Sequence, residues 1–214
     1  MTYSVKEIFY TLQGEGAQTG RPAVFCRFAG CNLWSGLERH RVSAVCSFCD
    51  TDFVGTDGQG GGKFESAELL ADAVDAAWPE RKSMSKKYVV CTGGEPLLQL
   101  DTVIINALHA RGFEIAVETN GTIKVPEGVD WICVSPKGSS KIVQISGDEL
   151  KLVYPQIESE VYPEKFEGLD FTHKYLQPMD SPELQKNVSA TIDYCMQNPD
   201  WKLSMQTHKI VGID

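Results

Sequence analysis

The sequence contains no apolar run long enough to cross a membrane and no excess of basic residues. A membrane-spanning helix needs ~18 or more consecutive apolar residues, and the apolar runs here are far shorter. The segment that begins at Met1 lacks the basic head and apolar stretch of a secretory signal. A formal net charge of −9 disfavours an extended nucleic-acid-binding face. We therefore expect a cytoplasmic protein that binds neither a membrane nor a nucleic acid.

Sequence repeats, a domain linker and a phosphate-binding loop are also missing. The glycine-rich segment from Gly55 to Gly62 follows no apolar strand and lacks a Gly-Lys-Ser/Thr ending, so we interpret it as a flexible loop. The 214 residues, 42% apolar and 23% charged, suit one folded chain with a full core. We expect a single domain spanning residues 1–214, with an extended loop at residues 31–51.

The extended loop holds three of the seven cysteines, Cys31, Cys46 and Cys49. An odd number of cysteines in a cytosolic chain favours metal binding or catalysis over a disulfide framework. Three soft thiolates can bind an iron–sulfur cube and leave its fourth iron open to an outside ligand. Two alternatives remain: a redox pair of Cys46 and Cys49, or a zinc site completed by His40. A second motif beginning at Gly93, Gly-Gly-Glu-Pro, favours the cube, because a zinc site would not require it.

Apolar periodicity predicts alternating strands and helices. Helices are expected from Ser66 to about Trp78, from Asp101 to Gly112 and from Leu184 to Gln197. Strands are expected at residues 3–11, 22–28, 87–92, 113–118, 130–135, 149–153 and 174–177, with a terminal strand at 201–206. Such alternation is typical of a parallel sheet, and about six such strands are too few for a closed eight-stranded barrel. The fold class is therefore predicted to be α/β, an open, partial (β/α)6-type TIM-like barrel with trimmed crossovers.

Polar residues follow the predicted strands, at Cys31, Thr92, Glu118, Ser135 and Gln177. The carboxyl ends of parallel barrel strands share one face, so these residues are expected to line one pocket. One predicted strand also contains a charged residue, Arg27. A buried charge requires a partner, which is a carboxylate either of the protein or of a ligand. We expect a ligand carboxylate.

These motifs resemble the radical S-adenosylmethionine superfamily and, within it, the family of 7-carboxy-7-deazaguanine synthases. The matching segments are residues 12–16, 25–27, 31–34, 46–51, 92–96, 118–121, 135–137 and 177–180. They extend over most of the chain. The superfamily's common spacing between the first two cysteines is three residues, so the interval from Cys31 to Cys46 contains a long insertion. Some members of the synthase family have such a loop.

The resemblance implies a 4Fe-4S cluster, S-adenosylmethionine and Mg2+ as cofactors. In this family, reductive cleavage of S-adenosylmethionine yields a 5′-deoxyadenosyl radical that takes a hydrogen from 6-carboxy-5,6,7,8-tetrahydropterin. Ring contraction with loss of ammonia then gives 7-carboxy-7-deazaguanine, an intermediate of queuosine biosynthesis. The cofactors carry the difficult chemistry, and the protein positions and shields them. An electron donor such as flavodoxin and a homodimeric assembly are also implied.

The resemblance assigns roles to residues of this sequence. The cluster ligands would be Cys31, Cys46 and Cys49, and Thr51 would bind Mg2+. Contacts to S-adenosylmethionine would come from Phe48, Cys49, Asp50, Gly94, Glu95, Ser135, Pro136, Lys137, Gln177, Pro178, Met179 and Asp180. The pterin would be held by Leu12, Gln13, Gly14, Arg27, Thr92 and Asp214, with Glu15 and His208 as catalytic residues. The short tail after His208 is also expected to fold back over the pocket.

Two other functions remain open from the residues. A glycyl-radical activating enzyme would use the same cluster and cofactor but would dock a large protein. The small polar segment beginning at Gln13, together with Arg27, suits an acidic heterocycle better. A zinc-stabilised binding module is the alternative outside enzymes.

Overall fold

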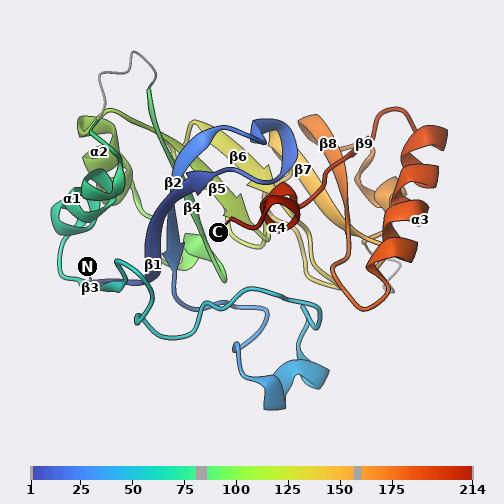
Figure 1. Ribbon diagram of the computed structural model, residues 1–214, viewed down its shortest axis with the longest axis horizontal. Coiled ribbons are helices and arrows are strands. Elements are labelled where there is room, and N and C mark those ends of the chain that lie inside the picture. Colours follow the sequence, from blue (N-terminus) through green and yellow to red (C-terminus); the bar gives the residue numbers. More distant parts are fainter. Residues whose placement is uncertain (1, 81–85, 157–160, 214) are drawn as a thin grey trace.

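A computed structural model describes residues 2–80, 86–156 and 161–213 of the chain. Within these residues, nine strands form one open sheet in the order β3-β1-β2-β4-β5-β6-β7-β8-β9 (Figure 1). The strands are β1 (Tyr3–Leu12), β2 (Pro22–Phe28), β3 (Gly62–Phe64), β4 (Lys87–Gly93), β5 (Phe113–Thr119), β6 (Trp131–Val134), β7 (Ser146–Tyr154), β8 (Asp170–Pro178) and β9 (Lys202–Leu203). No helix in the described ranges is long and apolar enough to cross a membrane.

Six strands, β2 and β4 to β8, run parallel, and the short β9 extends them. This confirms the predicted open, partial barrel. The first strand departs from the prediction, because β1 runs antiparallel to β2. Only residues 13–21 join β1 to β2, and a parallel pair needs a crossover of about a dozen residues or more.

The glycine-rich segment is not the free loop that its composition suggested. The Gly58 N–H donates to the carbonyl of Lys6 at 2.9 Å, and the Ile8 N–H donates to the carbonyl of Gln59 at 2.7 Å. From Gly62 the chain continues as β3, which pairs antiparallel with β1. The segment is therefore held by backbone hydrogen bonds to a neighbouring strand, a long-range pairing that local composition does not encode.

The three predicted helices are present as α1 (Ala67–Ala77), α2 (Thr102–Ala110) and α3 (Leu184–Gln197). The Ser66 hydroxyl accepts from the Leu69 N–H at the start of α1, and the Asp101 carboxylate caps α2. The predicted terminal strand at residues 201–206 is wrong in extent, since β9 has two residues. A short helix, α4 (Thr207–Val211), follows it and lies beside the sheet (Figure 1).

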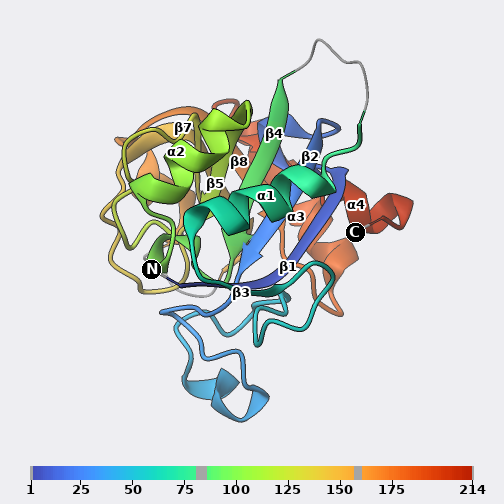
Figure 2. The ribbon, with the colours of Figure 1, turned by 90° about the vertical axis from the view of Figure 1, so that its left-hand side faces the viewer.

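The helices cover one face of the sheet and leave the other face for the site. Alternation along β2 sends Val24 and Cys26 into the core beneath α1 and α2, while Arg27 points to the opposite face. Along β7, Leu150 and Leu152 pack in a second core with α3. Figure 2 shows α1 and α2 lying across their half of the sheet. The uncovered face is concave and carries the polar side chains described below.

Two crossovers contain no helix within the described residues, those from β5 to β6 and from β6 to β7. The second was predicted to be trimmed, because only thirteen residues separate Ser135 from Glu149. Both segments remain as loops at the edge of the concave face.

Candidate active site

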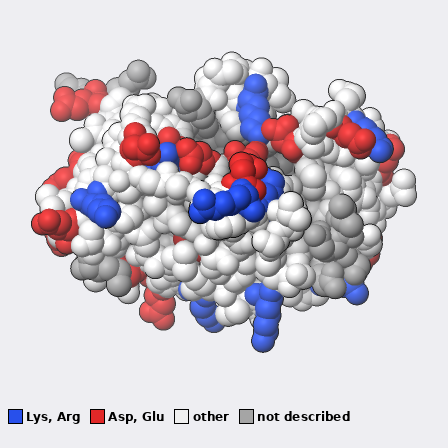
Figure 3. Space-filling view, turned by 90° about the horizontal axis from the view of Figure 1, so that it is seen from below, with Lys and Arg blue, Asp and Glu red and all other residues white. Residues whose placement is uncertain are grey.

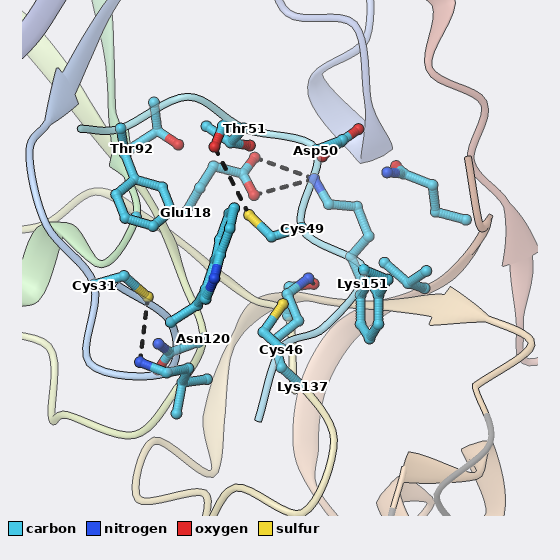
Figure 4. A pocket seen from close by; sticks show the side chains of 18 of the residues that line it. Cys31, Cys46, Cys49, Asp50, Thr51, Thr92, Glu118, Asn120, Lys137 and Lys151 are labelled. Carbon is cyan, nitrogen blue, oxygen red and sulfur yellow. Dashed lines mark hydrogen bonds and ion pairs between the residues drawn. The ribbon is translucent and has the colours of Figure 1, made fainter. Parts of the chain in front are cut away.

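A cavity of about 190 Å3 lies at the carboxyl ends of the parallel strands. The extended loop at residues 31–51 lies below the sheet at this end (Figure 1) and forms one wall of the cavity. Cys31, Cys46 and Cys49 all border the cavity, and Figure 4 shows their sulfur atoms around a common space. The structure therefore brings together the three thiols that the sequence singled out.

The chemistry of these thiols suits an iron–sulfur cluster. The hydrogen bond from the Cys46 thiol lowers the pKa of Cys49 to about 6, which favours its ligating thiolate form. The hydrogen bond with Cys49 raises the pKa of Cys46, and burial raises the pKa of Cys31. Cys31 Sγ accepts from the Leu33 N–H at 3.4 Å. Three convergent sulfurs in a half-buried loop fit a cube that spreads its ligands over several irons.

The same geometry disfavours a zinc site. Across residues 2–80, 86–156 and 161–213, no three His, Cys, Asp or Glu side chains come close enough to hold a single metal ion. His40, which was the candidate fourth ligand, is bonded through Nδ1 to the Ser35 hydroxyl at 2.8 Å. A tetrahedral zinc site needs all its ligands within bonding distance of one ion.

The Gly-Gly-Glu-Pro segment anchors the base of the cysteine loop. A Cβ on Gly94 would lie 2.4 Å from the carbonyl oxygen of Gly30, and one on Gly93 would lie 2.3 Å from that of Phe28. The N–H of Glu95 donates to the Gly30 carbonyl at 2.9 Å. Glycine is required here because β2 and β4 end in close contact. Close backbone packing is thus a second reason for glycine at position 94, besides the space that its missing side chain leaves for a ligand.

Arg41 holds the second half of the loop, a role that no pattern in the sequence indicated. Its guanidinium lies 4.2 Å from the ring centre of Trp34 and donates to the carbonyls of Ser47 and Cys49, each at 2.9 Å. It also pairs with Glu38. On the face seen from below, towards which this loop points, acidic and basic side chains lie beside one another (Figure 3).

A second cavity, of about 340 Å3, adjoins the first. Its walls include Gln13 and Gly14 at the end of β1, Arg27 of β2 and His208 of α4. Six residues border both cavities: Glu15, Asp50, Thr51, Thr92, Glu118 and Gln206. The two cavities therefore meet along a shared wall made by these six residues.

Arg27 has a partner within the protein, and its expected pairing with a ligand carboxylate stays a prediction. Its Nε donates to Glu7 Oε1 at 2.7 Å, and both side chains border the second cavity. Among the described residues, this is the one ion pair of Arg27. The guanidinium has further N–H donors beyond Nε, so the pair with Glu7 orients Arg27 without using its full capacity.

Lys209 of α4 connects the C-terminal segment to both sides of the first cavity. Its ammonium lies 2.6 Å from Asp50 Oδ2 and 2.5 Å from Asp180 Oδ2. Asp50 belongs to the cysteine loop, and Asp180 follows β8. A single ammonium thus holds α4 against two walls of the cavity.

We expect Lys209→Met to increase cleavage of S-adenosylmethionine without product formation by about threefold. The three side chains are partly exposed, so screening limits the strength of their interaction. The measurement is the ratio of 5′-deoxyadenosine to product. Lys186→Met, in the exposed pair with Glu183, is the control. Equal ratios in the two variants would show that Lys209 does not close the site.

Most of the predicted site residues border one of the two cavities. The first is lined by Phe48, Cys49, Asp50, Gly94, Ser135, Lys137, Gln177, Pro178, Met179 and Asp180, and the second by Leu12, Gln13, Gly14, Arg27, Thr92 and His208. Glu95 and Pro136 are buried and border neither of these two cavities. Glu95 instead accepts hydrogen bonds from Leu97, Thr119 and Asn120. Asp214 lies outside the described residues.

Sequence reasoning left several cavity-lining residues without a role, among them Glu118, Lys151 and Gln206. Lys151 had a usable signal, since it is a charge inside an apolar strand, as Arg27 is. Glu118 was noted at a strand end but received no role. Gln206 carried no signal, because its position depends on where α4 packs.

Comparison with known proteins agrees with this geometry. Residues 40–149 match the model of the radical SAM superfamily. The chain is 63% identical to the 7-carboxy-7-deazaguanine synthases of Caulobacter vibrioides and Bradyrhizobium diazoefficiens, over 100% of both chains in each case. It superimposes on the crystal structure of QueE from Escherichia coli with a TM-score of 0.72 at 28% identity, covering 97% of this chain and 95% of that one. The chain therefore belongs to the 7-carboxy-7-deazaguanine synthase family of radical SAM enzymes.

Proposed function

We propose that this protein converts 6-carboxy-5,6,7,8-tetrahydropterin to 7-carboxy-7-deazaguanine with loss of ammonia. The observation that carries the proposal is the pair of adjoining cavities, one with three thiols and one with Arg27 and Gln13. A radical generated in one cavity would reach a substrate in the other without crossing solvent. Full-length relatives at 63% identity that are named for this activity support it. The comparisons do not favour a glycyl-radical activating enzyme or a zinc-stabilised module.

In this proposal the first cavity binds the cofactors. Cys31, Cys46 and Cys49 would hold the 4Fe-4S cluster, and the walls contributed by Gly94 and by residues 177–180 would hold S-adenosylmethionine. When bound, these groups would supply the radical that abstracts a hydrogen from the substrate. The chain's own residues orient the cofactors and exclude water, and α4 covers the cavity through Lys209.

The second cavity would bind and orient the pterin. Arg27, held by Glu7, offers N–H donors suited to the substrate carboxylate. Glu15 and His208 are the proposed catalytic residues. Burial alone would raise the pKa of Glu15, but the ammonium of Lys151 outweighs it and lowers that pKa to about 2. Glu15 is thus ionised at neutral pH and can accept a hydrogen bond from an N–H group of the substrate.

We further propose that Thr51 binds Mg2+ where the cavities meet. Thr51 borders both cavities, and hydroxyl oxygen is a hard ligand of the kind that Mg2+ accepts alongside waters and substrate. Added Mg2+ is expected to raise the turnover of the wild type.

Thr51→Ala is expected to lose most of this response to Mg2+, because one oxygen ligand is removed. Initial rates over a magnesium titration, after treatment with a chelator, test the assignment. Thr172→Ala, at an exposed position of β8, is the matched control. If Thr51→Ala responds to Mg2+ as the wild type does, Thr51 is not the ligand.

An electron donor such as flavodoxin, a homodimeric state and a cytoplasmic location complete the proposal. The donor and the dimer are supported by the family resemblance. Exposed apolar side chains of α4, Ile210 and Val211, are available for a subunit contact. All seven cysteines are free thiols, the state that a reducing compartment maintains.

The test of the proposed function is an anaerobic assay of reconstituted protein with the tetrahydropterin, S-adenosylmethionine and a chemical reductant. Formation of 7-carboxy-7-deazaguanine with much less than one 5′-deoxyadenosine accumulating per product is expected, because loss of ammonia is redox-neutral and the hydrogen taken from the substrate has to be returned. Cleavage of S-adenosylmethionine with no deazaguanine at any pterin concentration would refute the proposed substrate.

A further inference from the structure

A buried group of four charged side chains lies on the concave face where the two cavities meet. Lys151 of β7 is at its centre, with a side chain only 4% exposed. Its Nζ lies 2.9 Å from Glu15 Oε2. The same Nζ lies 3.0 Å from Glu118 Oε2 (Figure 4). Glu149 is more distant, at 4.0 Å from Nζ. One ammonium therefore binds two carboxylates that come from different parts of the chain.

The second oxygen of each carboxylate is also held. Glu15 Oε1 accepts from Gln206 Nε2 at 3.0 Å, and Glu118 Oε1 accepts from Gln13 Nε2 at 3.2 Å. Each carboxylate is thus fixed by Lys151 on one side and by an amide on the other. Such doubly held groups have little rotational freedom, which is the condition for a preorganised site.

Glu149 does not compete for the ammonium. Its Oε2 accepts from the Ala17 N–H at 3.0 Å, while its Oε1 has no hydrogen-bond partner within the described part of the chain. Burial raises the pKa of Glu149, which favours its neutral form. The carboxylate oxygens nearest the Lys151 ammonium are therefore those of Glu15 and Glu118.

The positions of these residues relative to the cavities differ. Lys151 borders the first cavity and is not among the residues that line the second. Glu15 and Glu118 border both. An effect of Lys151 on a ligand in the second cavity must therefore pass through the two carboxylates.

We propose that Lys151 is a positioning residue for the pterin, which it reaches by holding the carboxylates of Glu118 and Glu15 towards the second cavity. The inference rests on the proposed function, because it takes the pterin as the ligand of that cavity. Carboxylates held in this way accept hydrogen bonds from N–H groups of the heterocycle. Lys151 itself contacts no part of the pterin.

The first test is Lys151→Met, which keeps a side chain of similar length and removes its positive charge. We expect the KM for the pterin to rise about tenfold or more, the scale of coupling between residues in one buried charge network. The KM for S-adenosylmethionine and the iron content should stay within about twofold of wild type. Lys186→Met is the control for the substitution itself. An unchanged pterin KM in a folded Lys151→Met protein would overturn the proposal.

A double-mutant cycle with Glu118→Gln tests whether Lys151 affects the pterin KM by positioning Glu118 or only by stabilising the protein. The double variant Lys151→Met/Glu118→Gln removes one charge of each sign, so the net charge of the junction is unchanged and folding is favoured. If Lys151 acts through Glu118, the pterin KM of the double variant should lie within about threefold of that of Glu118→Gln alone. A further increase of tenfold or more that is also seen when Lys151→Met is added to Glu15→Gln/Glu118→Gln would show independent action and overturn the proposal, even where Lys151→Met alone does not fold.

Failure of this inference is distinguishable from failure of the proposed function. Wild-type protein that forms no deazaguanine from the pterin refutes the function. Wild-type protein that forms it, with a pterin KM unaffected by Lys151→Met, refutes only the role of Lys151.

Discussion

Replacing Cys31, Cys46 or Cys49 with alanine is expected to abolish cleavage of S-adenosylmethionine, with a loss of more than about a hundredfold. Two thiolates cannot hold a cube that uses three protein ligands, and even the loss of partners outside the ligand shell costs a metal site about 10- to 100-fold. The measurements are iron and sulfide content after anaerobic reconstitution and 5′-deoxyadenosine formation under reducing conditions.

The other four cysteines provide the controls. Cys26, Cys91 and Cys133 are buried away from the three cluster thiols, and Cys195 lies on α3. Alanine at each of these positions is expected to leave cluster content unchanged. A Cys46→Ala protein with full iron and sulfide would show that the ligands were assigned wrongly.

Arg27→Ala is expected to raise the KM for the pterin by about a hundredfold. Truncating one partner of a buried, hydrogen-bonded charge pair costs ~2–5 kcal/mol, and here the loss would leave both Glu7 and the substrate carboxylate without a counter-ion. The KM for S-adenosylmethionine should change by less than about threefold, because Arg27 borders only the second of the two cavities. Steady-state kinetics with each substrate varied in turn measure the difference.

The control for Arg27 is Arg21→Ala. Arg21 forms a comparable ion pair, with Glu114 at 2.8 Å, and borders neither cavity. It should alter stability without changing either KM. If Arg27→Ala raises both Michaelis constants equally, Arg27 supports the fold of the site and does not bind the pterin.

Most of the fold was predictable because local rules decide it. The helix caps Ser66 and Asp101 and the apolar alternation of β2 and β4 are short-range patterns, and they give elements that match the structure. The parallel order follows from helices and long loops between strands. The pairing of β3 with β1 was missed, since it joins segments nearly sixty residues apart. The antiparallel direction of β1 was missed although only residues 13–21 separate it from β2.

The site residues likewise fall into those that the sequence predicted and those that it did not. Cys31, Cys46, Cys49 and the Gly-Gly-Glu-Pro segment at Gly93 carry their chemistry in residue type and spacing, so the sequence by itself determined the family and its cofactors. The partner of Arg27 was not determined, because Glu7 lies across a strand pair whose direction the sequence did not predict.

Only the tertiary structure decided how the two cavities meet and what holds their shared residues. Lys151, Glu118 and Gln206 come from segments far apart in the chain and converge through the curvature of the sheet and the packing of α4. The sequence shows which side chains are charged, but strand register decides which of the charged side chains lie together in the interior. An ammonium in an apolar strand shows only that a partner is needed, and the register of β7 against its neighbours determines that the partners are Glu15 and Glu118.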